Sequence, residues 1–281
     1  MSEPGKLYVV ATPIGNLEDI TLRAIRILKE VSLIAAEDTR RTRILLTHYE
    51  IRTPLTSLYE QNESSKSPVL IEKIREGRSI AYVTDAGTPA ISDPGYLLVR
   101  HAIEAGIGVI PIPGVSALIT ALCVSGLPMD HFVFQGFLPE KKGRRKTFLM
   151  SLKDDSRTQI FYESPNRLLA TLKDMRDLLG NRVVVVAREL TKVYEEVVRG
   201  ELDEVIQTFQ GKTIRGEITL VIAGEKTQAD VPDTEARIRE KYDFLSAQGG
   251  VSKRDIIDRI AKELVLPRKI VYDAVHRMSG E

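Results

Sequence analysis

The chain has 281 residues, of which 43% are hydrophobic and 28% are charged, as in ordinary globular proteins. Its 40 basic and 39 acidic residues leave a net charge of +1, so a nucleic-acid binder of this composition would need clustered basic residues. A single cysteine, Cys123, excludes an intrachain disulfide, and its apolar surroundings predict a small core residue. The polar N-terminus lacks a signal-peptide core and no apolar run could span a bilayer, so we expect a cytoplasmic protein without a membrane partner.

The first 125 residues alternate between apolar runs and helical periodicity. The pattern predicts strands at 7–12, 31–36, 53–58, 79–83 and 108–112, helices at 17–31, 69–76, 97–105 and 117–125, and a linker at 64–67. Strands that alternate with helices in this way are typical of a mostly parallel sheet with helices on its faces. We therefore expect residues 1–125 to form an N-terminal α/β domain.

The rest of the chain divides into two further parts. Residues 126–226 are expected to form a second α/β domain, with strands at 132–137, 158–162, 183–187, 196–199 and 218–223 and helices at 167–179 and 203–209. After a polar linker at 227–232, residues 233–281 are expected to be all helical, with a helix-turn-helix-like hairpin at 252–278. The basic excess of this hairpin is mild, so it supports a packing role and a nucleic-acid contact about equally.

The segment 85–95, Asp-Ala-Gly-Thr-Pro-Ala-Ile-Ser-Asp-Pro-Gly, follows a predicted buried strand. Its glycines permit positive φ or close approach of a ligand, and its prolines stiffen the loop. Turns at 13–16, 37–41 and 113–117 also follow predicted strands, so all four would open on one edge of a parallel sheet, where such sheets bind small molecules. There is no Walker P-loop or G-x-G-x-x-G motif, and the four histidines are too scattered to suggest a metal site.

One dense basic run, residues 141–146, follows the strand expected at 132–137. It is either a solvated loop or, in a two-domain cleft, a border of the mouth that contacts phosphate groups. The segment 161–167 also follows a predicted strand and brings together an aromatic residue, an acid and an arginine. Structural roles are the simpler interpretation of Tyr162 and Pro165.

Five motifs, taken in order, resemble those of the tetrapyrrole-methylase superfamily. They are Val-Ala-Thr-Pro-Ile-Gly-Asn-Leu at 10–17, Ala-Glu-Asp-Thr-Arg at 36–40, the loop at 85–95, Pro-Gly-Val-Ser-Ala-Leu at 113–118 and Phe-Tyr-Glu-Ser-Pro-Asn-Arg at 161–167. The first departs from the glycine-rich loop of the tetrapyrrole enzymes and is similar to the branch that methylates the 2′-hydroxyl of a cytidine in small-subunit (16S) ribosomal RNA. The resemblance implies two α/β domains with S-adenosylmethionine in the cleft between them, a helical appendage, a homodimer, and ribosomal RNA or the 30S subunit as partner.

The resemblance also assigns residues to the site. Contacts with the cofactor are implied for Pro13, Ile14, Gly15, Asp85, Ala86, Gly87, Thr88, Ile91, Ser116, Ala117, Tyr162 and Thr219. Residues that would face the substrate are Glu37, Arg40, Asn62, Arg167 and, in the basic run, Lys141, Lys142, Arg144, Arg145 and Lys146. A ribose hydroxyl is a poor nucleophile, so we hypothesise that Asp38 or Glu163 takes its proton, although either carboxylate could equally orient a neighbouring arginine.

Two other functions stay open from the sequence. One is methylation of a small molecule such as a tetrapyrrole with the same cofactor, against which the basic run and the C-terminal helices speak. The other is a non-catalytic RNA-binding protein that has kept the fold. RNA binding would weaken steeply with salt, and a scaffold without activity would not bind S-adenosylmethionine.

Overall fold

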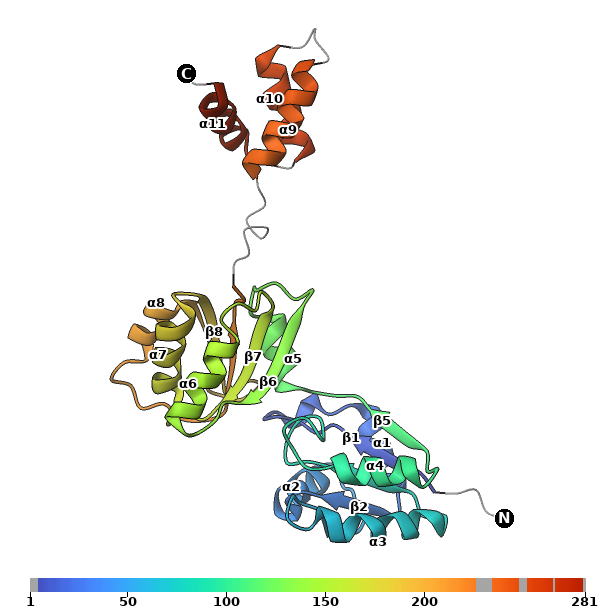
Figure 1. Cartoon of the computed structure of the whole chain (residues 1–281). Helices are drawn as coiled ribbons and strands as arrows, with labels where there is room; N and C mark the ends of the chain where they lie inside the picture. The colour runs from blue at the N-terminus through green and yellow to red at the C-terminus, as the bar shows by residue number, and fades with distance from the viewer. Residues whose placement is uncertain (1–4, 226–233, 248–251, 265, 280–281) are drawn as a thin grey trace. The chain divides into compact units, whose positions relative to one another are not determined.

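The computed structural model describes residues 5–225, 234–247, 252–264 and 266–279 (Figure 1). The chain forms two compact units, residues 1–225 and 226–281. The linker predicted at 227–232 lies outside the described residues. The division of the first unit near residue 125 stays a prediction.

The N-terminal half of unit 1 is built on a five-stranded sheet. Its strands are β1 (Leu7–Val10), β2 (Leu33–Ala36), β3 (Leu55–Ser57), β4 (Ile80–Val83) and β5 (Val109–Ile112). They lie in the order β3-β2-β4-β1-β5 and every neighbouring pair is parallel. The predicted parallel sheet is therefore confirmed, and the turns that follow its strands share one edge.

Helices cover both faces of this sheet because successive strand residues point to opposite sides. Helices α1 (Leu22–Glu30) and α2 (Thr39–His48) pack on the face that carries Ile34, whereas α3 (Glu63–Arg75) and α4 (Tyr96–Glu104) pack on the face that carries Ala35 and Tyr82. Each face forms a separate buried cluster. The turns at the carboxyl edge therefore stand on a rigid support.

Two sequence-based boundaries in this half are wrong. The linker expected at 64–67 is the first part of α3, because Ser67 continues the stripe of Leu70, Ile71 and Ile74 that faces the core and the helix accommodates Pro68. The helix expected at 17–31 is instead a short 3-10 turn, η1 (Leu17–Asp19), followed by α1. Thr21 separates the two and caps α1 by accepting a hydrogen bond from the Ala24 amide at 3.1 Å.

The second half of unit 1 contains a mixed sheet in the order β6-β7-β10-β8-β9. Its strands are β6 (Phe132–Phe137), β7 (Thr158–Glu163), β8 (Val183–Arg188), β9 (Glu196–Glu201) and β10 (Ile218–Ile222). Helices α6 (Lys142–Ser151), α7 (Leu168–Leu179) and α8 (Leu202–Phe209) cover one face, and α5 (Ala117–Cys123) packs on the other. Cys123 is exposed, contrary to the prediction, because α5 turns Ala121 and Leu122 towards the sheet.

Unit 2 is a three-helix module of α9 (Thr234–Ala247), α10 (Lys253–Glu263) and α11 (Arg268–Ser279). Its own core includes Ile238, Ile257, Ile260 and Val271. Ser252 caps α10 by accepting a hydrogen bond from the Asp255 amide at 3.2 Å. Within the described part of the chain, no helix is long and apolar enough to traverse a bilayer.

Candidate functional site

The turns that follow β1 and β4 are joined at the carboxyl edge of the first sheet. The backbones of Thr12 and Gly87 exchange two hydrogen bonds of 2.9 Å each. Gly87 has a φ of +82°, a conformation that costs a residue with a side chain but not glycine. The close approach of these two turns therefore depends on a glycine in the loop at 85–95.

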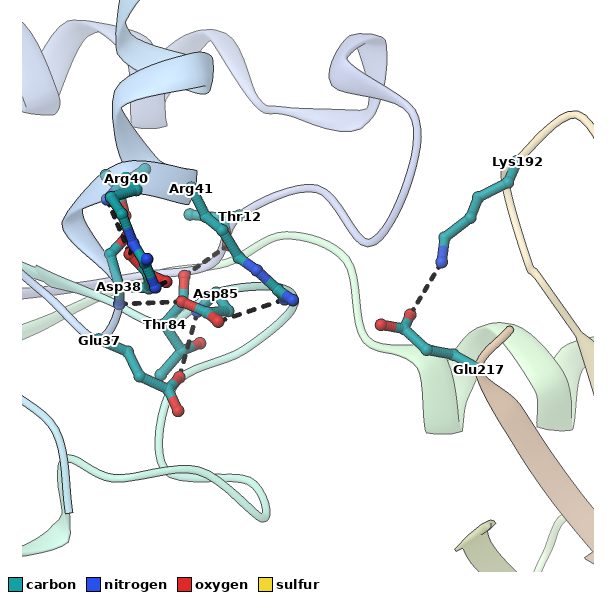
Figure 2. Close-up of polar contacts among 10 residues, drawn as sticks. Thr12, Glu37, Asp38, Arg40, Arg41, Thr84, Asp85, Lys192 and Glu217 are labelled. Atoms are coloured by element: carbon teal, nitrogen blue, oxygen red, sulfur yellow. Dashed lines mark hydrogen bonds and ion pairs between the residues drawn. The ribbon is translucent and has the colours of Figure 1, made fainter. Parts of the chain in front are cut away.

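Carboxylates connect the turn after β2 to the turn after β4, as Figure 2 shows. The Asp38 amide donates to Asp85 Oδ1 at 2.9 Å, and the Asp85 amide donates to Glu37 Oε2 at 3.3 Å. Arg41 of α2 adds an ion pair of 3.3 Å with Asp85 Oδ2. These contacts hold the Glu37 and Asp85 side chains at the rim of a cavity.

This cavity, of about 420 Å³, is lined by residues of both halves of unit 1. The N-terminal half and the start of α5 contribute Ile14, Glu37, Arg41, Asp85, Ala86, Gly87, Thr88, Ile91, Ser92, Asp93, Ser116 and Ala117. The second half contributes Phe137, Tyr162, Glu163, Ser164, Pro165, Ala187, Leu190, Gly216, Glu217, Ile218 and Thr219. The volume lies within the range of about 300–1,000 Å³ that small-molecule sites occupy.

The loop between β4 and α4 borders the cavity in a strained conformation. Ala90 and Ser92 have φ values of +67° and +64°, which cost residues with side chains about 1–3 kcal/mol each. The Ala90 amide donates to the Pro94 carbonyl at 3.2 Å and closes the loop on itself. The surrounding fold must therefore stabilise this conformation.

Glu63, at the start of α3, supplies part of that stabilisation. Its buried Oε1 accepts hydrogen bonds from the amides of Gly95, Leu97 and Leu98 at 3.0, 2.9 and 3.1 Å. These are the first amides of α4, which lack partners within the helix, and the carboxylate also faces the positive end of the helix dipole. The C-terminal end of the loop is thereby anchored to a helix from another part of the sheet.

Two carboxyl groups of the cavity, those of Asp93 and Glu37, are harder to ionise than usual. Burial raises the pKa of Asp93 to about 6; the charge of Glu37 adds to the effect, and the nearby Thr84 hydroxyl opposes it. Burial also raises the pKa of Glu37, partly offset by the hydrogen bond from the Asp85 amide. Asp93 therefore changes its charge much closer to neutral pH than an ordinary aspartate.

The loop between β8 and β9 reaches across to the turn after β1. Thr191 Oγ1 accepts a hydrogen bond from the Asn16 amide at 3.1 Å. Lys192 forms an ion pair of 3.1 Å with Glu217, a cavity residue of the second half (Figure 2). Gly15 leaves room for this lysine, because a Cβ at that position would lie 2.3 Å from Lys192 Cγ.

Glu163 borders the cavity, but both of its carboxylate oxygens accept hydrogen bonds from residues that follow it closely in the sequence. Its Oε1 accepts from the Ser164 amide at 2.7 Å and from Arg167 Nε at 2.8 Å, and its Oε2 accepts from the Thr171 hydroxyl at 2.6 Å. Arg167 also donates to the Leu138 carbonyl at 3.1 Å. This arrangement supports the orienting role that the sequence left open for Glu163.

Most residues expected to contact the cofactor lie together. All but Pro13 and Gly15 line the cavity, namely Ile14, Asp85, Ala86, Gly87, Thr88, Ile91, Ser116, Ala117, Tyr162 and Thr219. Pro13 borders a neighbouring hollow of about 130 Å³, and Gly15 lies against Lys192. Their contacts with a cofactor stay predictions.

The residues expected to act on the substrate are more dispersed. Of these, Glu37 lines the cavity together with Glu163. Asp38 instead accepts hydrogen bonds from Arg40 Nη2 and Nε at 2.8 and 3.1 Å, and these bonds lower the pKa of Asp38 to about 2. Asn62 precedes α3 and accepts a hydrogen bond from the Tyr59 amide at 2.9 Å. Asp38 is thus a weak proton acceptor.

The basic run is the start of a helix, α6, rather than a solvated loop. Arg145 is buried and forms an ion pair of 2.7 Å with Asp174 of α7, contrary to its prediction as a substrate residue, because its side of α6 packs on α7. Lys146 is half-buried and lies 3.6 Å from the same carboxylate. The exposed members of the run are Lys141, Lys142 and Arg144.

Sequence reasoning missed Asp93 and Lys192 as residues of the site. Asp93 stands in the loop that the sequence singles out, but no sequence pattern reports that its carboxyl group is half-buried beside Glu37. Lys192 belongs to a loop that contacts the turn after β1 through the hydrogen bond between Asn16 and Thr191. These two residues are 175 positions apart in the sequence. Contacts over such separations leave no periodic signal.

The two-sheet architecture with a cavity between the sheets defines a known class. Solved structures of this fold include uroporphyrin-III C-methyltransferase from Thermus thermophilus (TM-score 0.56, 21% identity) and cobalt precorrin-4 methyltransferase (TM-score 0.58, 19% identity), each covering 78% of this chain and 94% of the other. The sequence model of the tetrapyrrole (corrin/porphyrin) methylases matches residues 6–206, so the chain belongs to this family. Membership makes the protein a methyltransferase.

More similar relatives carry a more specific name. A protein of Halalkalibacterium halodurans is 48% identical over 98% of this chain and 96% of its own length, and one of Bacillus subtilis is 45% identical over 98% and 95%. A third, from Thermotoga maritima, is 50% identical over 79% of this chain and 100% of its own length. All three are named ribosomal RNA small subunit methyltransferase I.

Proposed function

We propose that this protein is an S-adenosylmethionine-dependent methyltransferase that modifies the ribose 2′-hydroxyl of a cytidine in small-subunit ribosomal RNA. One observation carries the proposal: relatives that share 48% of residues over nearly the whole chain are named for methylation of that RNA. The cavity between the two halves of unit 1 supports it, because it is of a size for a nucleoside-containing cofactor.

The lining of the cavity fits S-adenosylmethionine. The turn at 85–88 presents backbone groups around Gly87, whose conformation lets a ligand approach closely. Ser116, Ala117 and Thr219 would hold the cofactor from the remaining walls, and the carboxylate of Glu37 would favour its positive charge. When bound, S-adenosylmethionine supplies an activated methyl group on a sulfonium centre.

Positioning would account for most of the catalysis by this chain. Transfer from a sulfonium to an oxygen disperses charge rather than creating it, so little new charge needs stabilisation. Correct placement of two reactants can contribute about 7–11 kcal/mol to lowering a barrier. The carboxylates that link the turns after β2 and β4, and the strained loop at 88–95, provide rigid walls for that placement.

RNA contacts are proposed for the exposed part of the basic run. Lys142 and Arg144 project from the start of α6 and could neutralise phosphates without reading sequence. Arg145 is left out of this proposal because it forms a buried ion pair with Asp174. We also propose that the protein works in the cytoplasm as a homodimer, and light scattering of the purified chain tests the second point.

The decisive experiment maps ribose methylation by mass spectrometry. Small-subunit RNA from a strain lacking the gene should lack one cytidine 2′-O-methyl group, and addition of the protein and S-adenosylmethionine to the purified 30S subunits or their free RNA should restore it. Calorimetry should detect binding of S-adenosylmethionine to the protein alone. An unchanged methylation map would refute the RNA substrate, and salt-insensitive methylation of a tetrapyrrole would support the small-molecule alternative.

A further inference from the structure

Five carboxylates line the cavity: Glu37, Asp85, Asp93, Glu163 and Glu217. Most of them accept a hydrogen bond from a backbone amide or form an ion pair with a cationic side chain. Asp85 accepts from the Asp38 amide and pairs with Arg41, Glu163 pairs with Arg167, and Glu217 pairs with Lys192. Glu37 accepts from the Asp85 amide.

Asp93 differs from these four. Within the described part of the chain, its carboxyl group forms no ion pair, and the Thr84 hydroxyl is the one uncharged side chain that favours its ionised form. The groups that face it are otherwise of like charge: Glu37 from the turn after β2, Asp85 from the turn after β4, and Glu217 before β10. Arg41 also lines the cavity but pairs with Asp85, and the nearby phenols are those of Tyr82 and Tyr162. An ionised Asp93 therefore has little that stabilises its charge.

The backbone around Asp93 is held at a cost. Ser92, directly before it, and Ala90 both have positive φ, and the anchor that holds the loop is the buried carboxylate of Glu63. Conformations of this kind persist only where the rest of the fold over-determines them, and they occur preferentially at functional sites. The strain here places one uncommitted carboxyl group beside the cavity.

We propose that Asp93 is the proton acceptor of the methyl transfer, a role that rests on the proposed ribose substrate. The ribose oxygen forms a bond to the methyl carbon while the carbon–sulfur bond breaks and its electron pair stays on sulfur. The hydroxyl proton passes to the Asp93 carboxylate, which becomes a neutral carboxylic acid and later releases the proton to water. The reactants are the sulfonium, the alcohol and the carboxylate, and the products are an uncharged thioether, a methyl ether and a neutral acid. Atoms and net charge are therefore equal on the two sides.

This assignment explains why the carboxyl group is kept apart from cations. A general base is most effective when its pKa is near the working pH, because a large fraction is then deprotonated and its affinity for a proton is still substantial. Asp38, whose pKa is lowered by Arg40, lacks this property. Burial near Glu37 gives Asp93 a pKa of about 6, so it is ionised at neutral pH and still a useful acceptor.

The test compares Asp93→Asn with wild type and with Asp154→Asn, a matched exposed aspartate of the second half. Single-turnover transfer of methyl to 30S subunits is measured from pH 5 to 9, and S-adenosylmethionine binding is measured by calorimetry. We expect Asp93→Asn to lower the rate about 100-fold or more, with cofactor affinity changed less than about threefold. The wild-type rate should rise with pH through about 6 and then level off, and this rise should disappear in Asp93→Asn. Asp93→Glu, which keeps a carboxyl group, should recover part of both the rate and the pH dependence.

Each result against the proposal is distinct. A wild-type rate and the same pH dependence in Asp93→Asn would show that another group accepts the proton. A loss of cofactor affinity as large as the loss of rate would place Asp93 in cofactor binding instead. If the wild-type protein transfers no methyl to ribose at all, the proposed function fails and this assignment fails with it.

Discussion

At the scale of single residues, the carboxyl group of Asp93 lowers the stability of the fold that holds it. Its pKa rises from 3.8 to about 6 on folding, so the unfolded chain loses this proton at lower pH than the folded protein does. The contribution of Asp93 therefore lowers the free energy of unfolding increasingly as pH rises from about 4 to 6, and this loss reaches its full size above that range. We expect Asp93→Asn to melt near the wild-type temperature at pH 4 and at a higher temperature at pH 8. Calorimetric melting of the cofactor-free proteins measures this, and equal melting temperatures at pH 8 would contradict it.

A second pair of residues separates a structural arginine from an exposed one. Arg145→Ala leaves the buried Asp174 carboxylate without its closest partner, so we expect the free energy of unfolding to fall by about 3–5 kcal/mol. Arg144→Ala removes an exposed cation, so stability should stay within about 0.5 kcal/mol while RNA affinity and its salt dependence both decrease. Urea unfolding and salt-titrated RNA binding measure the two effects. The interpretation fails if both variants lose stability equally.

At the scale of elements, the junction of the loop at 88–95 with α4 requires a glycine. Gly95 has a φ of +122°, and a Cβ there would lie 2.3 Å from Cε1 of the buried Tyr82. Gly95→Ala should therefore lower the free energy of unfolding by about 2–5 kcal/mol, from the sum of backbone strain and overpacking. Gly106→Ala is the control: its φ is +69° but the space around it is open, so about 1–2 kcal/mol is expected. Similar losses in urea unfolding would mean that the contact with Tyr82 is unimportant.

The elements also show where sequence reasoning succeeds. Apolar runs and helical periodicity locate every strand of both sheets to within two residues at each end, because each strand buries at least one face. The start of α3 could not be predicted in this way, since Glu63 is buried by hydrogen bonds to α4, a distant partner. The same holds for Arg145, which looks like part of a solvated basic run until α7 places Asp174 beside it. Most cavity-lining turns were predictable because parallel strands end at one edge, whereas the ionisation of Asp93 depends on three segments that meet only after folding.

At the scale of the whole molecule, the methyltransferase unit and the helical module have separate cores. The cavity is lined entirely by residues of unit 1, and the buried cluster of unit 2 is formed by α9, α10 and α11 alone. The Thermotoga maritima relative aligns along its whole length with 222 residues of this chain, which leaves 59 residues (281 − 222) without a counterpart. That number is close to the 56 residues of unit 2, which spans 226–281.

We therefore expect a chain that ends at Thr227 to fold and to bind S-adenosylmethionine. This truncation keeps Glu225, which pairs with the buried Arg182 and whose amide donates to the Asp155 carbonyl at 2.7 Å, so the last strand of the second sheet stays anchored. The melting temperature should lie within about 4 °C of the full chain, the shift that about 1 kcal/mol causes in a domain of this size, and cofactor affinity should be unchanged. Calorimetry measures both, with a truncation at Gly224 as the comparison that lacks the Glu225 side chain and should melt lower. The expectation fails if the full-length chain binds the cofactor and the chain that ends at Thr227 does not. That result would mean that unit 2 supports the cavity. In that case the helices of unit 2 would be part of the unit that binds the cofactor.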